Sequence, residues 1–216
     1  MNKEVLYDEP RIVLYHDVFS KDECTDLIEG VPPDRYFAAE GFDFATKTGI
    51  PTEYRSNSTY VDREYRLVTL QDRLTKLIEE ELVGTPHNKK DCIELPLQLQ
   101  KYDVGQQYKK HVDFFNRPNE PKIFSVERVA SAIVYLNDGF EGGETHFTTL
   151  NIKVTPKAGM ALFFRYDYND PYINMNTFHA ALPVSSGAKY IITAFIRSEP
   201  LEFGNWNPII WNRSSG

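Results

Sequence analysis

Residues 188–198 read AKYIITAFIRS, and residues 126–137 read VERVASAIVYLN. Both stretches are rich in β-branched and aromatic residues with a period of two, which is typical of β-strands. From about residue 94 this period continues through about seven or eight short segments separated by glycine, asparagine and proline. No helical period intervenes. The sequence therefore predicts an antiparallel sandwich or jelly roll over residues 94–198.

The N-terminal third of the chain has a different pattern. Residues 11–19, RIVLYHDVF, are typical of a strand, and residues 20–30 begin with a Ser–Glu capping box and end at a glycine, which predicts a helix. Residues 63–86 carry leucine and isoleucine at helical spacing, which predicts a second, amphipathic helix. We expect both helices to brace one outer face of a sheet.

These patterns predict an α+β fold that is mainly β, a double-stranded β-helix (jelly roll) core braced by N-terminal helices. No internal repeat or linker divides the 216 residues, so we expect a single domain. Its parts would be an N-terminal helical support region (1–93), the jelly-roll core (94–198) and a C-terminal tail (199–216).

Composition limits the function classes. The net charge of −7 argues against a nucleic-acid partner. The two cysteines, Cys24 and Cys92, lack CxxC spacing, which excludes a cysteine-built zinc site and favours a reducing compartment. The N-terminus lacks the apolar stretch of a signal peptide, and no segment approaches the ~20 apolar residues of a membrane span. We expect a cytoplasmic protein with no membrane partner, and the sequence does not indicate its oligomeric state.

Residues 107–115, QYKKHVDFF, place His111 and Asp113 two positions apart. Side chains at i and i+2 of a strand share a face, so the two could hold one ion, given a third ligand. His179, at the start of a later predicted strand, is the natural candidate. Two histidines and one carboxylate are typical of non-haem Fe(II) oxygenases, and hydrolytic zinc sites use the same set. A lone His-x-Asp is also often only a surface ion pair.

Lys189 suggests a second charged group at the same site. The turn signal PVSSG (183–187) predicts that residues 179–184 and 188–196 form adjacent strands of a hairpin. Lys189 would then share a strand face with Thr193 and Phe195. A lysine inside a β fold needs an anion, so we interpret it as an anion socket close to the metal. The alternative is an ordinary surface lysine.

Three segments carry a resemblance to a known family. They are YDVGQQYKKHVDFF (102–115), AIVYLNDGFEGGETHF (132–147) and FHAALPVSSGAKYIITAFIRS (178–198). In order and spacing they resemble the motifs of the prolyl 4-hydroxylase family of Fe(II)/2-oxoglutarate-dependent dioxygenases. The N-terminal YRSNSTYV (54–61) resembles the family's Arg-Ser strand more loosely.

The resemblance implies Fe(II), 2-oxoglutarate and O₂ as cofactor and cosubstrates, with ascorbate as reductant. It implies three iron ligands, namely His111, Asp113 and His179. It implies catalytic roles for these ligands and for Lys189, which would pair with the distal carboxylate of 2-oxoglutarate. It further implies that Tyr102, Tyr135 and Thr193 help to bind this cosubstrate. His146, and likewise His16 and His87, are expected to be non-ligating.

For the substrate, the resemblance implies that a proline-containing peptide is held by Tyr108, Arg128 and Phe195. Many family members carry tryptophan where this chain has Phe195, and Arg128 could instead be a solvated charge at a strand end. The long loops 116–127 and 165–176 are plausible lids. We expect 4-hydroxylation of a peptidyl proline with release of succinate and CO₂. The alternatives are another acceptor, such as a different side chain, an amino acid or a small metabolite, and a non-catalytic jelly-roll binding module.

Overall fold

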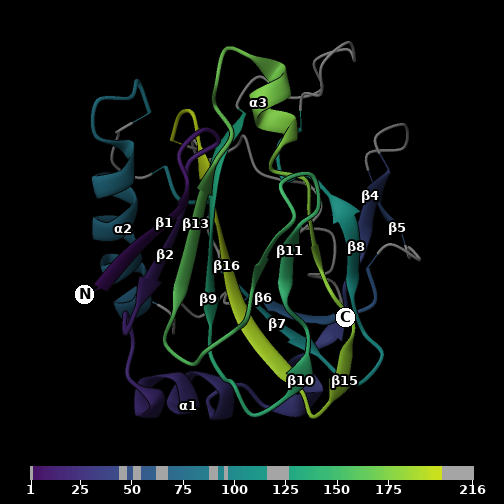
Figure 1. Cartoon of the computed structure of the whole chain (residues 1–216). Helices are drawn as coiled ribbons and strands as arrows, with labels where there is room; N and C mark the ends of the chain where they lie inside the picture. Colours follow the sequence, from purple (N-terminus) through teal and green to yellow (C-terminus); the bar gives the residue numbers. More distant parts are fainter. Residues whose placement is uncertain are drawn as a thin grey trace.

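The structure is a computed structural model, and it describes residues 2–43, 48–50, 55–61, 68–87, 92–94, 97–115 and 127–200. Its largest element is an eight-stranded sheet, in the order β1 (Asn2–Tyr7), β2 (Ile12–His16), β13 (Ala161–Arg165), β9 (Arg128–Tyr135), β16 (Lys189–Arg197), β7 (Gln98–Tyr102), β6 (Ser58–Val61) and β3 (Phe37–Ala38). A four-stranded sheet contains β12 (Ile152–Val154), β11 (Thr145–Phe147), β14 (His179–Ala181) and β8 (Tyr108–His111). Figure 1 shows the two sheets side by side.

Smaller elements complete the fold. Two strand pairs are β10 (Glu141–Gly142) with β15 (Val184–Ser186), and β4 (Gly41–Asp43) with β5 (Thr48–Ile50). The helices are α1 (Lys21–Glu29), α2 (Val68–Leu82), α3 (Pro171–Met175) and a 3-10 turn at Pro33–Arg35. Every strand pairing is antiparallel in the part of the chain that the structure describes. The predicted fold class, a mainly β jelly roll with N-terminal helices, is confirmed.

Helix α1 begins where the sequence predicts. The Ser20 hydroxyl accepts a hydrogen bond from the backbone N–H of Glu23 (3.2 Å), and the Glu23 carboxylate accepts one from the N–H of Ser20 (2.8 Å). This reciprocal capping satisfies two N–H groups that have no partner within the helix. The Glu23 carboxylate also pairs with the Arg73 guanidinium of α2 at 2.8 Å, which joins the two helices.

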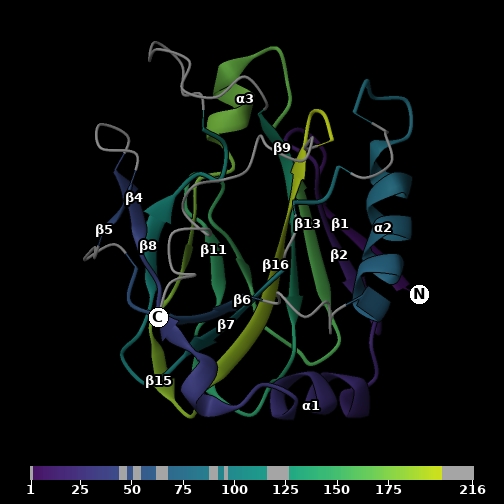
Figure 2. The same ribbon diagram turned by 180° about the vertical axis from the view of Figure 1, so that it is seen from behind.

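Helix α2 covers the outer face of the large sheet. Its leucines and isoleucine at helical spacing are buried against β2, β9, β13 and β16, and they are Leu70, Leu74, Leu77, Ile78 and Leu82. In Figure 1 the helix stands beside β1 and β2, with α1 across one end of the sheets, and Figure 2 shows the same from behind. The predicted packing on an outer sheet face is confirmed for α2, whereas α1 lies across one end of the sheets (Figure 1). None of the helices in the described ranges has the length and apolar character needed to cross a membrane.

A second hydrophobic core fills the space between the two sheets. Tyr135, Phe164 and Ile191 of the large sheet and Phe147 of the small sheet belong to one buried cluster. Along β16 the burial alternates between the two cores: Ile191 faces the small sheet, whereas Ile192, Ala194 and Ile196 belong to the cluster under the helices. This alternation directs Lys189, two residues before Ile191, towards the inner core.

The predicted hairpin between residues 179–184 and 188–196 is wrong. β14 lies in the four-stranded sheet, β15 pairs with β10, and β16 lies in the large sheet between β9 and β7. The nine residues of β16 are buried or half-buried, so its backbone groups require partners on both edges, and two long strands supply them. The turn at Gly187 therefore carries the chain from one sheet to the other.

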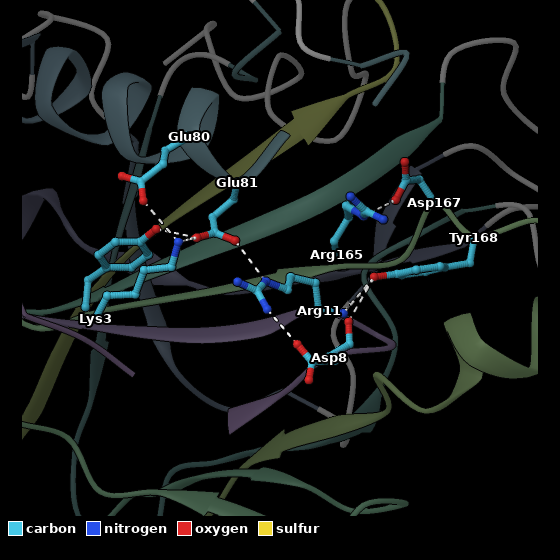
Figure 3. Close-up of polar contacts among 9 residues, drawn as sticks. Lys3, Asp8, Arg11, Glu80, Glu81, Arg165, Asp167 and Tyr168 are labelled. Carbon is cyan, nitrogen blue, oxygen red and sulfur yellow. Dashed lines mark hydrogen bonds and ion pairs between the residues drawn. The ribbon is translucent and has the colours of Figure 1, made fainter. Parts of the chain in front are cut away.

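The N-terminal residues contribute more than helices. β1, β2, β3 and β6 all extend the large sheet, and the sequence analysis did not recognise β1. β1 and β2 are joined to α2 by the buried Glu81 carboxylate, which contacts Lys3 and Arg11 (3.0 Å), as Figure 3 shows. The same carboxylate accepts a hydrogen bond from the Tyr15 hydroxyl. Burial alone would raise the pKa of Glu81, but hydrogen bonds from these three partners outweigh it and hold the pKa below its usual value.

Candidate active site

The structure brings His111, Asp113 and His179 together. His111 ends β8, His179 begins β14, and the two residues face each other as cross-strand partners. Asp113 lies just beyond the end of β8. The ligand atoms of the three side chains lie within 4.8 Å of one another. His111 Nε2 is 3.5 Å from Asp113 Oδ1, and His179 Nε2 is 3.8 Å from Asp113 Oδ2.

Both histidines are oriented by main-chain carbonyl groups two residues earlier. His111 Nδ1 lies 2.7 Å from the carbonyl oxygen of Lys109, and His179 Nδ1 lies 3.0 Å from that of Thr177. A carbonyl oxygen can only accept a hydrogen bond, so each Nδ1 carries the proton. In the neutral imidazole, Nε2 then directs its lone pair towards the carboxylate, which is the arrangement in which histidine binds a metal.

The protonation states also suit metal binding. Burial, followed by the nearby His111, lowers the pKa of His179 to about 4, so its imidazole is neutral at physiological pH. Burial would raise the pKa of Asp113, but the two histidines and the Ser131 hydroxyl outweigh it, and its pKa lies below the usual value. Two imidazoles and one carboxylate form a ligand set that fits a divalent transition metal. In the part of the chain that the structure describes, no second group of three such side chains lies this close together.

Lys189 is buried near this group, with 1% of its surface exposed. Its Nζ donates a hydrogen bond to the Gly143 carbonyl (2.6 Å) and lies 5.2 and 5.8 Å from the ring centres of Tyr102 and Tyr135. No ion pair involves Lys189 among the described residues. Burial lowers its pKa to about 7, and the opposing effect of the Glu144 carboxylate is smaller. The alternative that Lys189 is a surface residue is wrong.

Strand register explains why these residues meet. Lys189 is the cross-strand partner of Tyr102 on β7, and Ile191 is the partner of Tyr135 on β9. Cross-strand partners project from the same face of a sheet. Lysine and both tyrosines therefore lie on the inner face of the large sheet. The Tyr135 hydroxyl donates to the Thr145 hydroxyl at 2.8 Å, which links this face to the small sheet.

Gln100 is a buried polar residue that the sequence analysis missed. Its side-chain amide donates to the Thr193 hydroxyl (3.1 Å), and its side-chain oxygen accepts from the Tyr102 hydroxyl (2.9 Å). Gln100 thus connects two of the residues predicted to bind the cosubstrate. The available signal was its position two residues before Tyr102, on the same face of a predicted strand.

The Gly142–Gly143 pair makes room for Lys189. Both residues have positive φ angles, +73° and +68°, which glycine adopts without strain. A Cβ on Gly142 would lie 2.4 Å from the Pro183 carbonyl oxygen, and one on Gly143 would lie 3.2 Å from Cδ of Lys189. The tight turn predicted here also brings the Gly143 carbonyl to the lysine.

Tyr108 lies directly against the histidine pair. Its ring stacks on that of His111, with ring centres 3.5 Å apart and planes 12° apart. The Arg55 guanidinium lies 5.0 Å from the centre of the Tyr108 ring on the other strand of an isolated β-bridge. Tyr108 is half-buried and adjacent to the triad, and its contact with a substrate stays a prediction.

Arg128 is a buried residue, so the alternative of a solvated charge at a strand end is wrong. Its Nε and one terminal nitrogen each lie 3.1 Å from a Glu94 carboxylate oxygen. The other terminal nitrogen lies 3.4 Å from the main-chain oxygen of Asp113. The guanidinium also lies 3.5 Å above the centre of the half-buried Phe195 ring. Contacts of Arg128 and Phe195 with a substrate stay predictions.

The remaining predicted features lie elsewhere. His16, His87 and His146 pair with Glu4, Asp167 and Asn151, respectively, and take no part in the triad. Of the two proposed lid loops, residues 116–126 lie outside the described residues. The loop 165–176 contains the short helix α3, which the sequence analysis missed. The signal was present, because Asp170 caps the helix and Pro171 is its first residue.

Comparison with known proteins agrees with this geometry. Residues 97–197, which include the triad and Lys189, match the family model of the 2OG-Fe(II) oxygenase superfamily. The human prolyl 4-hydroxylase subunit alpha-3 is 30% identical over 210 residues, 94% of this chain and 36% of that protein. The probable prolyl 4-hydroxylase 9 of Arabidopsis thaliana is 26% identical over 219 residues, 92% of this chain and 73% of that protein. Residues 97–197 thus form a 2OG-Fe(II) oxygenase domain, and most of the chain is similar to prolyl 4-hydroxylases.

A solved structure of the family has the same fold. The viral collagen prolyl hydroxylase from Paramecium Bursaria Chlorella virus-1, in its complex with 2-oxoglutarate, superposes with a TM-score of 0.61 at 27% identity. The match covers 86% of this chain and 95% of the viral one. By contrast, this chain spans only about a third of the length of the human relative.

Proposed function

We propose that this protein is an Fe(II)- and 2-oxoglutarate-dependent dioxygenase that 4-hydroxylates proline in a peptide or protein. The observation that carries the proposal is the buried amine of Lys189. In the described residues its only hydrogen-bond partner is the neutral carbonyl of Gly143. The amine is also close enough to His179, one of the three clustered side chains, to affect the pKa of that histidine. A buried amine can carry its positive charge at low cost only beside an anionic partner, and 2-oxoglutarate offers a carboxylate.

Each residue has a defined part in this proposal. His111, Asp113 and His179 hold Fe(II), and Lys189 pairs with the distal carboxylate of 2-oxoglutarate. Tyr102 and Tyr135 flank the lysine, while Gln100 and Thr193 fix the Tyr102 hydroxyl. When bound, iron and 2-oxoglutarate supply the oxidising power for hydroxylation of an unactivated C–H bond, with release of succinate and CO₂. Ascorbate serves as reductant.

Proline as the acceptor is supported by the family relationship and by the aromatic surface beside the triad. Relatives named prolyl 4-hydroxylases align over more than nine-tenths of this chain. Tyr108 stacks on His111 and so presents a flat apolar surface close to the metal ligands. Aromatic surfaces of this kind suit proline-rich segments, which adopt an extended conformation at low entropic cost.

The test is a peptide assay with mass-spectrometric detection. The protein is incubated with Fe(II), 2-oxoglutarate, ascorbate and a proline-rich peptide, beside the same peptide with alanine in place of proline. We expect a gain of one oxygen atom on proline and an equal amount of succinate, both abolished by His179→Ala. Turnover with another acceptor only would replace proline as the substrate. Failure of wild-type protein to bind iron and 2-oxoglutarate would instead favour a binding module.

A further inference from the structure

Strand β9 passes directly beside Asp113 and contacts it through two residues. In its pairing with β16, Ala130 lies opposite Ile196 but Arg128 lies opposite Arg197, so Val129 is an extra residue that forms a β-bulge. In a regular strand, residues three apart project from opposite faces. The bulge removes this restriction, and both Arg128 and Ser131 reach Asp113.

The Ser131 hydroxyl connects Asp113 to a buried tyrosine. Ser131 is fully buried, and its Oγ lies 2.6 Å from Asp113 Oδ2 and 2.9 Å from the Tyr166 hydroxyl. Serine has a single hydroxyl proton, and an ionised carboxylate only accepts. The proton of Ser131 therefore points to Asp113, and Tyr166 donates its own proton to Ser131. The result is a directed chain of two hydrogen bonds from Tyr166 through Ser131 to Asp113.

This chain distinguishes the two oxygens of the carboxylate. Oδ2 accepts a short hydrogen bond from the Ser131 hydroxyl, whereas Oδ1 faces the imidazole of His111. Oδ1 also makes the closer approach to an imidazole nitrogen, 3.5 Å to His111 compared with 3.8 Å from Oδ2 to His179. A carboxylate held by one oxygen presents the other in a fixed direction.

We propose that Ser131 and Tyr166 are positioning residues for the metal site: they hold Asp113 by Oδ2 so that Oδ1 alone is offered to the metal. This role rests on the proposed function, because it concerns the same metal centre. With Oδ2 engaged by Ser131, coordination of a metal through both carboxylate oxygens would be disfavoured, which would leave room at the metal for 2-oxoglutarate and O₂. Arg128, clamped by Glu94, holds the main chain of Asp113 and supports the same orientation.

The test measures metal binding rather than turnover. Wild type, Ser131→Ala, Ser131→Thr and Tyr166→Phe are titrated anaerobically with Co(II), and both affinity and visible spectrum are recorded. We expect Ser131→Ala to weaken binding about 10- to 100-fold, the range for loss of a residue that orients a metal ligand. Its spectrum should also show the weaker bands of a higher coordination number. Ser131→Thr should restore both properties, and Tyr166→Phe should give a smaller change in the same direction.

Tyr36→Phe is the matched control, because its buried hydroxyl has no hydrogen-bond partner in the described ranges; this variant should bind Co(II) like wild type. If Ser131→Ala does not fold, the comparison of Tyr166→Phe with Tyr36→Phe decides the question. Identical affinity and spectrum in wild type and all variants would overturn the positioning role while leaving the proposed function intact. Absence of metal binding in wild type would instead overturn the proposed function.

Discussion

Replacement of Lys189 by methionine should remove a large, pH-dependent free-energy cost. The lysine is buried, and its pKa falls from the usual 10.5 to about 7. Each pKa unit corresponds to about 1.4 kcal/mol, so the charged amine costs about 5 kcal/mol in the ligand-free protein. Solvent screening does not reduce this figure appreciably, since the side chain is almost completely buried.

The sign of the pH dependence follows from proton counts. Between pH 7 and 10.5 the lysine is protonated in the unfolded chain but neutral in the folded protein, so unfolding takes up a proton. Stability contributed by this group therefore rises with pH, by about 1.4 kcal/mol per pH unit, and is lowest below pH 7. We expect Lys189→Met to be more stable than wild type at pH 6, by up to about 5 kcal/mol. The difference should shrink as the pH rises.

Urea unfolding of both proteins from pH 6 to pH 9 measures this effect, with the exposed Lys157→Met as control. The same reasoning applies to 2-oxoglutarate, whose carboxylate would restore the ammonium form of Lys189. Its binding above pH 7 should take up a proton and weaken about tenfold per pH unit, as measured by calorimetry in buffers of different ionisation enthalpy. If the stability difference between wild type and Lys189→Met does not change with pH, and 2-oxoglutarate binding is also independent of pH, the reasoning is refuted.

Three further substitutions test the framework, each measured by urea unfolding. Glu81→Gln should lower the free energy of unfolding by about 2–3 kcal/mol at pH 7. Because the pKa of Glu81 is depressed, the difference from wild type should vanish as the pH falls through that pKa. A difference that persists in acid would contradict this prediction. Gly142→Ala should lower the free energy of unfolding by more than Gly105→Ala does. Gly105 has a similar φ but open space around it, so its replacement should cost only the about 1–2 kcal/mol of backbone strain. Equal losses of stability would disprove the predicted clash with Pro183. Glu94→Gln should lower the free energy of unfolding by about 3–5 kcal/mol, because the buried Arg128 and Arg197 would lose their carboxylate partner. Unchanged stability would show that both arginines find other partners.

The parts of the fold that the sequence predicted are those governed by local rules. The cap at Ser20 and the leucine spacing of α2 depend on neighbours within a few residues, and both formed as expected. Period-two burial likewise directed Lys189 inward. These features are readable because side-chain direction follows from backbone periodicity alone.

Strand pairing depended on information that local patterns do not contain. The turn at Gly187 is compatible with a hairpin, yet the chain crosses between sheets there because the buried β16 requires partners on both edges. The exposed strand β1 lacks a hydrophobic pattern. It is held instead by pairing with β2 and by the contact of Lys3 with the distant Glu81. Such contacts between distant residues appear only when the fold is known.

The sequence predicted the site residues that belong to a recognisable motif, but not those that reach the site through tertiary packing. The His111, Asp113 and His179 group follows from the family motifs, and the structure places the three together. The bulge at Val129 and the burial of Arg128 against Glu94 have no local signature. For the same reason Ser131, in the middle of an apolar strand, gave no sign of its contact with Asp113.

Anaerobic titration of the metal-free protein with Fe(II), with and without 2-oxoglutarate, tests the central claim most directly. We expect one iron per chain, and a visible charge-transfer absorption that develops only when both are present. His179→Ala should lose iron binding, and Lys189→Met should retain iron but fail to develop the absorption. Iron binding that survives His179→Ala, or 2-oxoglutarate binding that survives Lys189→Met, would contradict the assignment of this site.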